Sequence, residues 1–191
     1  MTRIFNANQL MHGLVRNRYK KVQQHLRSEF TLEAHFTQQL PGNAGSIMCC
    51  HYMSPRPSYK EYDESFTIYI LDILRPRTLK NFRVLVGGMA HELAHLVRYM
   101  NGSHYSHPNS EKQVDGIVLS KGLGKYLLEA KRYIREYNPG FIFTGYAPED
   151  LETLASSRAL VNPRASRASR SSLPSRTPIY KAGSRRPRTR S

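Results

Sequence analysis

Apolar residues recur along the first part of the chain at intervals typical of a helix. From Asn6 to about Phe36 they fall near the 3.6-residue period, which predicts one long α-helix. A turn follows, because Pro41, Gly42, Asn43 and Gly45 gather within a few positions. The predicted helix also carries basic side chains, which we interpret as a solvated face. These are Arg16, Arg18, Lys20, Lys21 and Arg27.

Two segments after this turn carry the signals of β-strands. Ser46–Met53 is predicted to be a short strand, in which the adjacent Cys49 and Cys50 would point to opposite faces. We interpret both thiols as buried and unreactive. Ser65–Leu74 is rich in β-branched and aromatic residues and is the strongest strand prediction in the chain. Pro76 ends it.

Two helices are predicted in the second half of the chain. Thr78 can cap the first, which runs to about Met100 and ends at Asn101-Gly102. The second begins at a capping box, Ser110–Gln113, and is expected to continue to about Tyr137. Strands followed by helices predict an α+β fold, in which a small sheet packs on these helices.

Composition and charge divide the chain into two parts. It has 191 residues, a hydrophobic fraction of 39%, and 29 basic against 14 acidic side chains, a net charge of +15. Residues 156–191 hold nine Arg, one Lys and no acid, among many Ser and Pro. Such a stretch cannot bury enough apolar surface to fold. We therefore expect a folded domain at residues 1–150 and a disordered basic tail at 151–191. Residues 156–191 of this tail would bind nucleic acid non-specifically through phosphates.

Several classes of protein are excluded by the same composition. No apolar run approaches the ~18–20 residues of a membrane span, and residues 1–10 lack the features of a secretory signal. The two cysteines are neighbours, which fits neither a disulfide scaffold nor a four-cysteine zinc module. We expect an intracellular, cytoplasmic protein with no membrane partner.

The pattern that carries chemistry is His91-Glu92-Leu93-Ala94-His95, inside the helix that Thr78 caps. Residues four apart share a helix face, so the imidazoles of His91 and His95 can reach one ion. Glu92 is one residue further round the helix, where it can approach an activated water without being a ligand. This is the arrangement of zinc hydrolases. Gly87-Gly88 is unusual within a helix, and Gly88, one turn before His91, leaves room either for substrate or for a closely packed strand.

A catalytic zinc site needs a third protein ligand and one open position. Glu111 opens the next predicted helix after a loop long enough to reverse the chain, and would then point at the metal. Asp115 is one turn further along the same face, where it can accept the outer N–H of a ligand histidine. His104 and His107 in the intervening loop are alternative third ligands.

These residues resemble a known signature. His91–His95 followed by Glu111–Asp115 is similar to the HExxH…ExxxD pattern of gluzincin-type metallopeptidases, including the minimal intracellular enzymes of the ImmA/IrrE-like and SprT-like groups. The resemblance covers about Ser65–Tyr137. It implies a minimal zincin-like domain, with a small sheet on an active-site helix and a following metal-ligand helix. It also implies that Phe66–Leu74 is the edge strand along which an extended substrate binds.

Related zinc enzymes differ from this pattern in their third ligand. The metzincin continuation is absent, because Arg98 and Asn101 stand where its glycine and third histidine would be. An SprT-like enzyme would instead take its third ligand from the loop that holds His104 and His107.

The sequence therefore predicts a zinc-dependent metallopeptidase that hydrolyses a protein or peptide substrate. Zinc (Zn²⁺) would be held by His91, His95 and Glu111, with Glu92 as general base. The alternative is a nucleic-acid-associated or virion structural protein that uses the basic tail, residues 156–191, and keeps the fold without catalysis.

Overall fold

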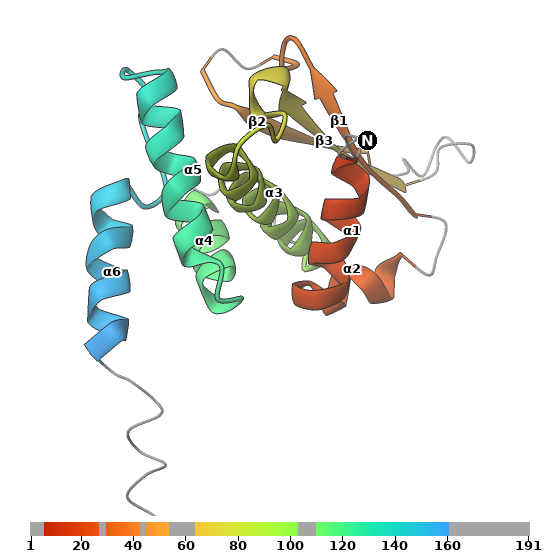
Figure 1. Ribbon diagram of the computed structural model, residues 1–191. Coiled ribbons are helices and arrows are strands. Elements are labelled where there is room, and N and C mark those ends of the chain that lie inside the picture. Colours follow the sequence, from red (N-terminus) through yellow and green to blue (C-terminus); the bar gives the residue numbers. More distant parts are fainter. Residues whose placement is uncertain (1–5, 27–29, 43–44, 54–63, 103–109, 161–191) are drawn as a thin grey trace, which may run out of the picture.

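Helix α3 lies at the centre of the fold, between a small sheet and a group of C-terminal helices (Figure 1). The computed structural model describes residues 6–26, 30–42, 45–53, 64–102 and 110–160. The helices in these ranges are α1 (Ala7–Arg18), α2 (Lys20–His25), α3 (Leu79–Met100), α4 (Ser110–Ser120), α5 (Gly124–Tyr137) and α6 (Pro148–Leu160). The strands are β1 (Phe30–Thr37), β2 (Met48–Met53) and β3 (Glu64–Leu71), and a 3₁₀ turn, η1 (Asp72–Leu74), follows β3. The described part is thus a mixed α/β fold, as the sequence predicts.

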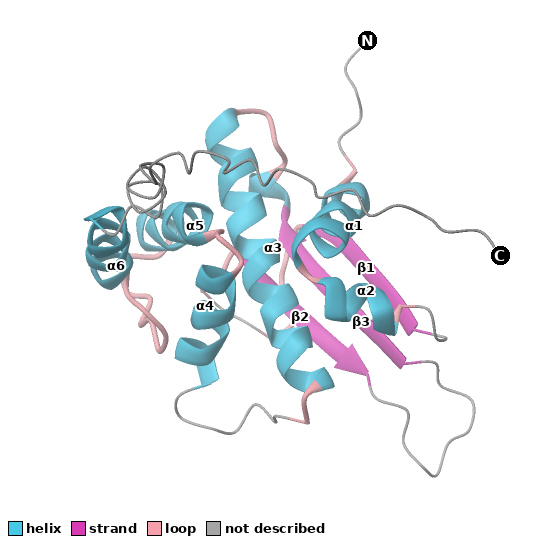
Figure 2. Ribbon diagram, turned by 90° about the horizontal axis from the view of Figure 1, so that it is seen from below, coloured by secondary structure: helices cyan, strands magenta, loops and turns pink. Residues whose placement is uncertain are grey.

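The three strands form a mixed sheet in the order β1-β3-β2. β1 runs parallel to β3, and β2 runs antiparallel to it, with Cys50 opposite Ile68. The side chains of Phe66, Ile68 and Ile70 in β3 are fully buried. Within the described residues β3 is therefore the central strand, which corrects the expectation that Phe66–Leu74 forms an edge. The edge strand next to α3 is β2 (Figure 2).

The single long helix predicted from Asn6 to Phe36 is wrong in its second half. The helix breaks at Tyr19, and the segment from Phe30 is strand β1. Phe30, Leu32 and Ala34 are buried, whereas the residues between them are exposed, which is the two-residue period of a half-buried strand. Phe30 also stands four residues after Leu26, so it fits either period, and the helical reading overlooked the alternation.

The second predicted helix is also interrupted, because α4 ends at Ser120 and α5 begins at Gly124. Gly122 has a φ of +73°, the left-handed conformation that glycine adopts most readily. Its N–H bonds to the carbonyl of Leu119, and the N–H of Leu123 bonds to that of Val118. This pair of bonds is the Schellman motif that ends helices.

Helix α3 follows its prediction closely. The Thr78 side chain accepts a hydrogen bond from the N–H of Asn81, and the helix runs from Leu79 to Met100. A Cβ at Gly87 would lie 2.0 Å from the carbonyl oxygen of Tyr126, so this glycine lets α3 and α5 approach closely. A Cβ at Gly88 would instead meet the Met48 side chain of β2. The two glycines thus serve close packing on two sides of the helix.

We expect Gly87→Ala to destabilise the fold, although alanine is the better helix former. Added core atoms cost about 1–3 kcal/mol, and here the obstacle is α5 backbone rather than a flexible side chain. Gly116→Ala in α4 is the matched control, because a Cβ there meets nothing within 4 Å. That variant should gain up to ~1 kcal/mol from helix propensity. Urea unfolding measures both, and a stabilised Gly87→Ala protein would contradict the close packing.

The C-terminal part contains one helix that spans the predicted domain boundary. α6 runs from Pro148 to Leu160, so the boundary expected at residue 150 falls inside it, and Leu151 joins the core. The basic stretch 161–191 and the loop 103–109 lie outside the described residues. None of the helices in the described ranges is long and apolar enough to cross a membrane.

Candidate metal centre

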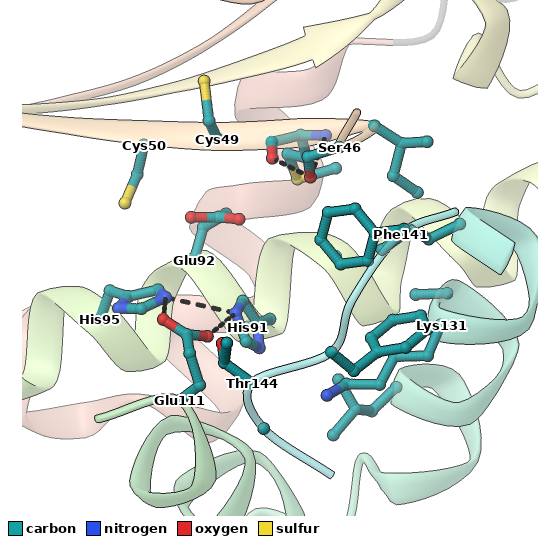
Figure 3. A pocket seen from close by; sticks show the side chains of 18 residues that line it. Ser46, Cys49, Cys50, His91, Glu92, His95, Glu111, Lys131, Phe141 and Thr144 are labelled. Carbon is teal, nitrogen blue, oxygen red and sulfur yellow. Dashed lines mark hydrogen bonds and ion pairs between the residues drawn. The ribbon is translucent and has the colours of Figure 1, made fainter. Parts of the chain in front are cut away.

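Helices α3 and α4 bring three potential ligands to one point (Figure 3). The Nε2 atoms of His91 and His95 are 3.2 Å apart. The Glu111 carboxylate lies 3.1 Å from the first and 3.5 Å from the second. In the part of the chain that the structure describes, these are the side chains grouped closely enough to hold a metal ion. The two alternative ligands, His104 and His107, lie outside the described residues.

The sequence positions these groups through helix periodicity and one chain reversal. His91 and His95 are one turn apart on α3, and Glu111 is in the first turn of α4, which packs against α3. His95 is buried and His91 half-buried, and the Glu111 side chain is 28% exposed. The predicted trio is thus brought together with its donor atoms facing one another, at the wall of a cavity.

Asp115 contacts the cluster through the ring of His91. Its Oδ1 lies 3.1 Å from the Nδ1 of His91, and the carboxylate is completely buried. An Nδ1–H donated to this oxygen leaves the lone pair of Nε2 directed at the cluster, which is the tautomer that a metal ligand needs. Asp115 therefore lies where the sequence expected an orienting partner.

The second oxygen of Asp115 belongs to a buried polar network that the sequence did not reveal. Lys131 of α5 places its Nζ 2.5 Å from Oδ2 and also donates to the carbonyl of Tyr146 at 2.7 Å. The N–H of Tyr146 donates to the same Oδ2 at 2.8 Å. Gly145 passes so close that a Cβ would lie 2.4 Å from Asp115. The network fixes the Asp115 carboxylate against α5 and the following loop.

The electrostatics of the cluster favour a positive charge between its carboxylates. Burial, with help from the neighbouring His91, lowers the pKa of His95 to about 3. Burial would also lower the pKa of His91, but hydrogen bonds to Asp115 and Glu111 outweigh it and raise that pKa to about 10. Burial opposes the ionisation of Glu111 and Asp115, yet their hydrogen bonds to His91 hold the pKa of each carboxyl below its ordinary value.

Glu92 lies beside the ligands but is not one of them. It is buried, and its carboxylate sits between α3 and β2, facing Cys50 (Figure 3). Burial raises the pKa of Glu92, although the charge of His91 and a hydrogen bond from the Cys50 thiol oppose this. A carboxyl whose pKa is moved towards neutrality is suited to accepting and returning a proton.

The two cysteines point to opposite faces of β2, as the sequence predicts (Figure 3). Both are half-buried rather than fully buried. Burial raises the pKa of the Cys49 thiol to about 11, and it raises that of Cys50 as well. The thiolate forms are therefore disfavoured, which agrees with the interpretation of unreactive thiols.

A cavity of about 310 Å³ opens beside the cluster. One wall is the consecutive segment Ser46–Cys50, whose side chains alternate, so the backbone edge of β2 itself faces the cavity. The opposite wall is apolar and comes from α5 and the loop after it, including Ile134, Phe141 and Phe143. Thr144 of that loop and Glu111 both line the cavity (Figure 3).

Sequence reasoning missed the contributions of α5 and the loop to this site. Lys131 looks like any basic residue of an amphipathic helix, and residues 141–145 follow a predicted helix end. The one available signal for this loop was its three aromatic residues, Phe141, Phe143 and Tyr146, in a segment without a helical or strand period.

No protein-family model, curated protein or solved structure matches this chain. What the site can do is therefore argued from its own donor atoms. Two imidazoles and one carboxylate form one of the standard ligand sets of catalytic zinc, and all three residues line the cavity. The donor set is therefore one that could hold a zinc ion.

Proposed function

We propose that the protein is a zinc-dependent metallopeptidase. The observation that carries this proposal is the convergence of His91, His95 and Glu111 on one point, with the carboxylate of Glu92 beside them at the wall of a cavity. The motif alone indicates metal binding, whereas the third ligand and the adjoining cavity are what hydrolysis requires in addition.

Each residue of the site would have a distinct role in the proposed reaction. His91, His95 and Glu111 would hold the ion, and Asp115 keeps His91 in the required tautomer. When bound, zinc acts as a Lewis acid and makes water nucleophilic near neutral pH. Glu92 accepts the proton of the attacking water and returns it to the leaving amine.

The shape of the cavity favours a peptide as substrate. An extended chain can pair with the backbone edge of β2 at Met48–Cys50, where it would replace the Ser46 hydroxyl that now bonds to the N–H and carbonyl of Met48. Strand addition provides main-chain hydrogen bonds without demanding a particular sequence. The facing wall around Ile134, Phe141 and Phe143 would receive an apolar side chain next to the cleaved bond. β2 thereby takes the part that the sequence analysis gave to β3.

The proposal agrees with the resemblance to gluzincin-type enzymes. Glu111 on a helix after the HExxH helix supplies the third ligand, and Asp115 one turn later contacts His91. A sheet edge, a helix with the two histidines and a following ligand helix are all present in the described residues. We propose a minimal zincin-like domain on this basis.

Metal content tests the proposal directly. After chelation and reloading, the purified protein should hold one zinc per chain by mass spectrometry of the metal. His95→Ala and Glu111→Gln should each weaken zinc binding by more than ~100-fold, because changing even a hydrogen-bond partner of a ligand costs ~10–100-fold. The matched control is His35→Ala, which removes an exposed histidine of β1. A wild-type protein without zinc affinity, or unchanged affinity in His95→Ala, would refute the site.

A further inference from the structure

Positive charge within the folded part is concentrated in the first two helices. The first 28 residues contain six basic side chains and no acid, whereas residues 29–155 contain 13 basic and 14 acidic ones. The described members of this group, Arg16, Arg18, Lys20 and Lys21, are all exposed on α1 and α2. The charge excess of the domain thus lies at one place on its surface.

The fold builds a hollow at this place. It has a volume of about 280 Å³ and is formed by Asn17–Lys21 at the α1–α2 junction, Val97 of α3 and Lys121 at the α4–α5 turn. Buried Tyr19 anchors the junction by donating to the carbonyl of Ala90 at 2.6 Å. A bond of 3.4 Å from Arg18 to the carbonyl of Lys121 ties the two sides together. Four cationic side chains and no acid therefore surround one depression.

None of these four cations has an acidic partner in the described part of the chain. Arg18, Lys20, Lys21 and Lys121 form no ion pair with any acid of the described residues. Four basic residues of α3 and α5 are paired with acids instead, in Lys80–Glu136, Arg83–Glu129, Arg132–Glu152 and Arg135–Glu149. Clustered cations without acids repel one another, so their arrangement gains most from a ligand that brings several negative charges.

We propose that this basic hollow, defined by Arg18, Lys20, Lys21 and Lys121, binds the phosphate backbone of a nucleic acid. Phosphates spaced along a strand match cations presented by three separate elements. A membrane is disfavoured, since none of the large apolar side chains exposed in the described part lines the hollow. They are Met53, Ile73, Leu79, Tyr137 and Ile142. A protein partner is disfavoured because protein interfaces are poor in lysine.

The hollow would add a fixed contact to the charge of the C-terminal stretch. Residues 156–191 supply ten more cations in sequence. The proposal does not depend on peptidase activity, because no residue of the hollow belongs to the metal centre or its cavity.

The test compares two full-length variants of equal net charge. The hollow variant carries Arg18→Gln, Lys20→Gln, Lys21→Gln and Lys121→Gln. The control variant carries Lys80→Gln, Arg83→Gln, Arg132→Gln and Arg135→Gln. Binding of a fluorescein-labelled 20-base-pair DNA duplex of mixed sequence is measured by anisotropy from 50 to 300 mM NaCl, and binding to phosphatidylcholine–phosphatidylserine vesicles by sedimentation.

We expect the hollow variant to bind the duplex at least ~10-fold more weakly, with a slope of log K against log salt that is less steep by about 3–4, close to one for each phosphate contact removed. The control should lose less than ~3-fold. Equal losses in both variants, no loss in either, or a loss confined to vesicles would each overturn the proposal. If the fourfold variant unfolds early, Lys20→Gln/Lys21→Gln against Arg132→Gln/Arg135→Gln repeats the comparison with an expected slope change of about 2.

Discussion

Replacing Glu92 by Gln is expected to lower kcat for peptide hydrolysis by about 10²–10⁴-fold, the usual contribution of a general base. Gln keeps the size of the side chain but cannot accept the proton of the attacking water. Glu92 is buried beside the ligand cluster without belonging to it, so the variant should bind zinc as well as the wild type does. Turnover of a quenched-fluorescent peptide library of mixed sequence measures the rate, and metal analysis of the same samples measures zinc.

The control for this prediction is Glu129→Gln, which removes a half-buried carboxylate from an ion pair with Arg83, away from the cavity. It should leave both kcat and zinc content unchanged. A zinc-loaded Glu92→Gln protein with wild-type turnover would show that another group takes the proton, and the proposed mechanism would then fail. A variant that loses zinc together with activity would show instead that Glu92 acts on the ligand cluster.

The centre of the site could be predicted from the sequence better than the residues around it. His91 and His95 are four residues apart on one helix, and helix geometry alone puts their rings on the same face. Glu111 required only that the chain reverse after α3. Lys131 and the loop at residues 141–145 could not be foreseen, because they reach the site through the packing of α5 against α3, which a Gly at position 87 permits.

The same contrast holds for the fold. β3 and α3 carry strong local signals, a run of β-branched and aromatic residues in one and a capped apolar stripe in the other. β1 was predicted to be helical because Phe30 fits a helical as well as an alternating pattern. The order of the strands is set by tertiary packing, so the central position of β3 and the edge position of β2 were not in the local pattern.

Lys131→Met is expected to be the most destabilising of the substitutions considered, at about 3–5 kcal/mol in free energy of unfolding. The Lys131 side chain is 6% exposed and that of Asp115 is 0% exposed, so removing the ammonium leaves a buried carboxylate without its closest cation. Zinc affinity should fall as well, by ~10–100-fold, because Asp115 would no longer be held in position to orient His91. Urea unfolding and zinc titration measure the two effects.

The control is Lys80→Met, which breaks the pair with Glu136 on the surface, where water replaces the lost partner. It should change the free energy of unfolding little.

The double variant Asp115→Asn/Lys131→Met separates charge from packing, because it removes the carboxylate charge along with its counterion. It should recover part of the stability that Lys131→Met loses, since a neutral amide is cheaper to bury than an unpaired carboxylate. It should not recover zinc affinity to the same degree, because Asn accepts a weaker hydrogen bond from the Nδ1–H of His91 than a carboxylate does. Equal free energies of unfolding for Lys131→Met and Lys80→Met would contradict the prediction. The buried network would then not hold Asp115 in place, and α3 and Glu111 alone would determine the position of His91.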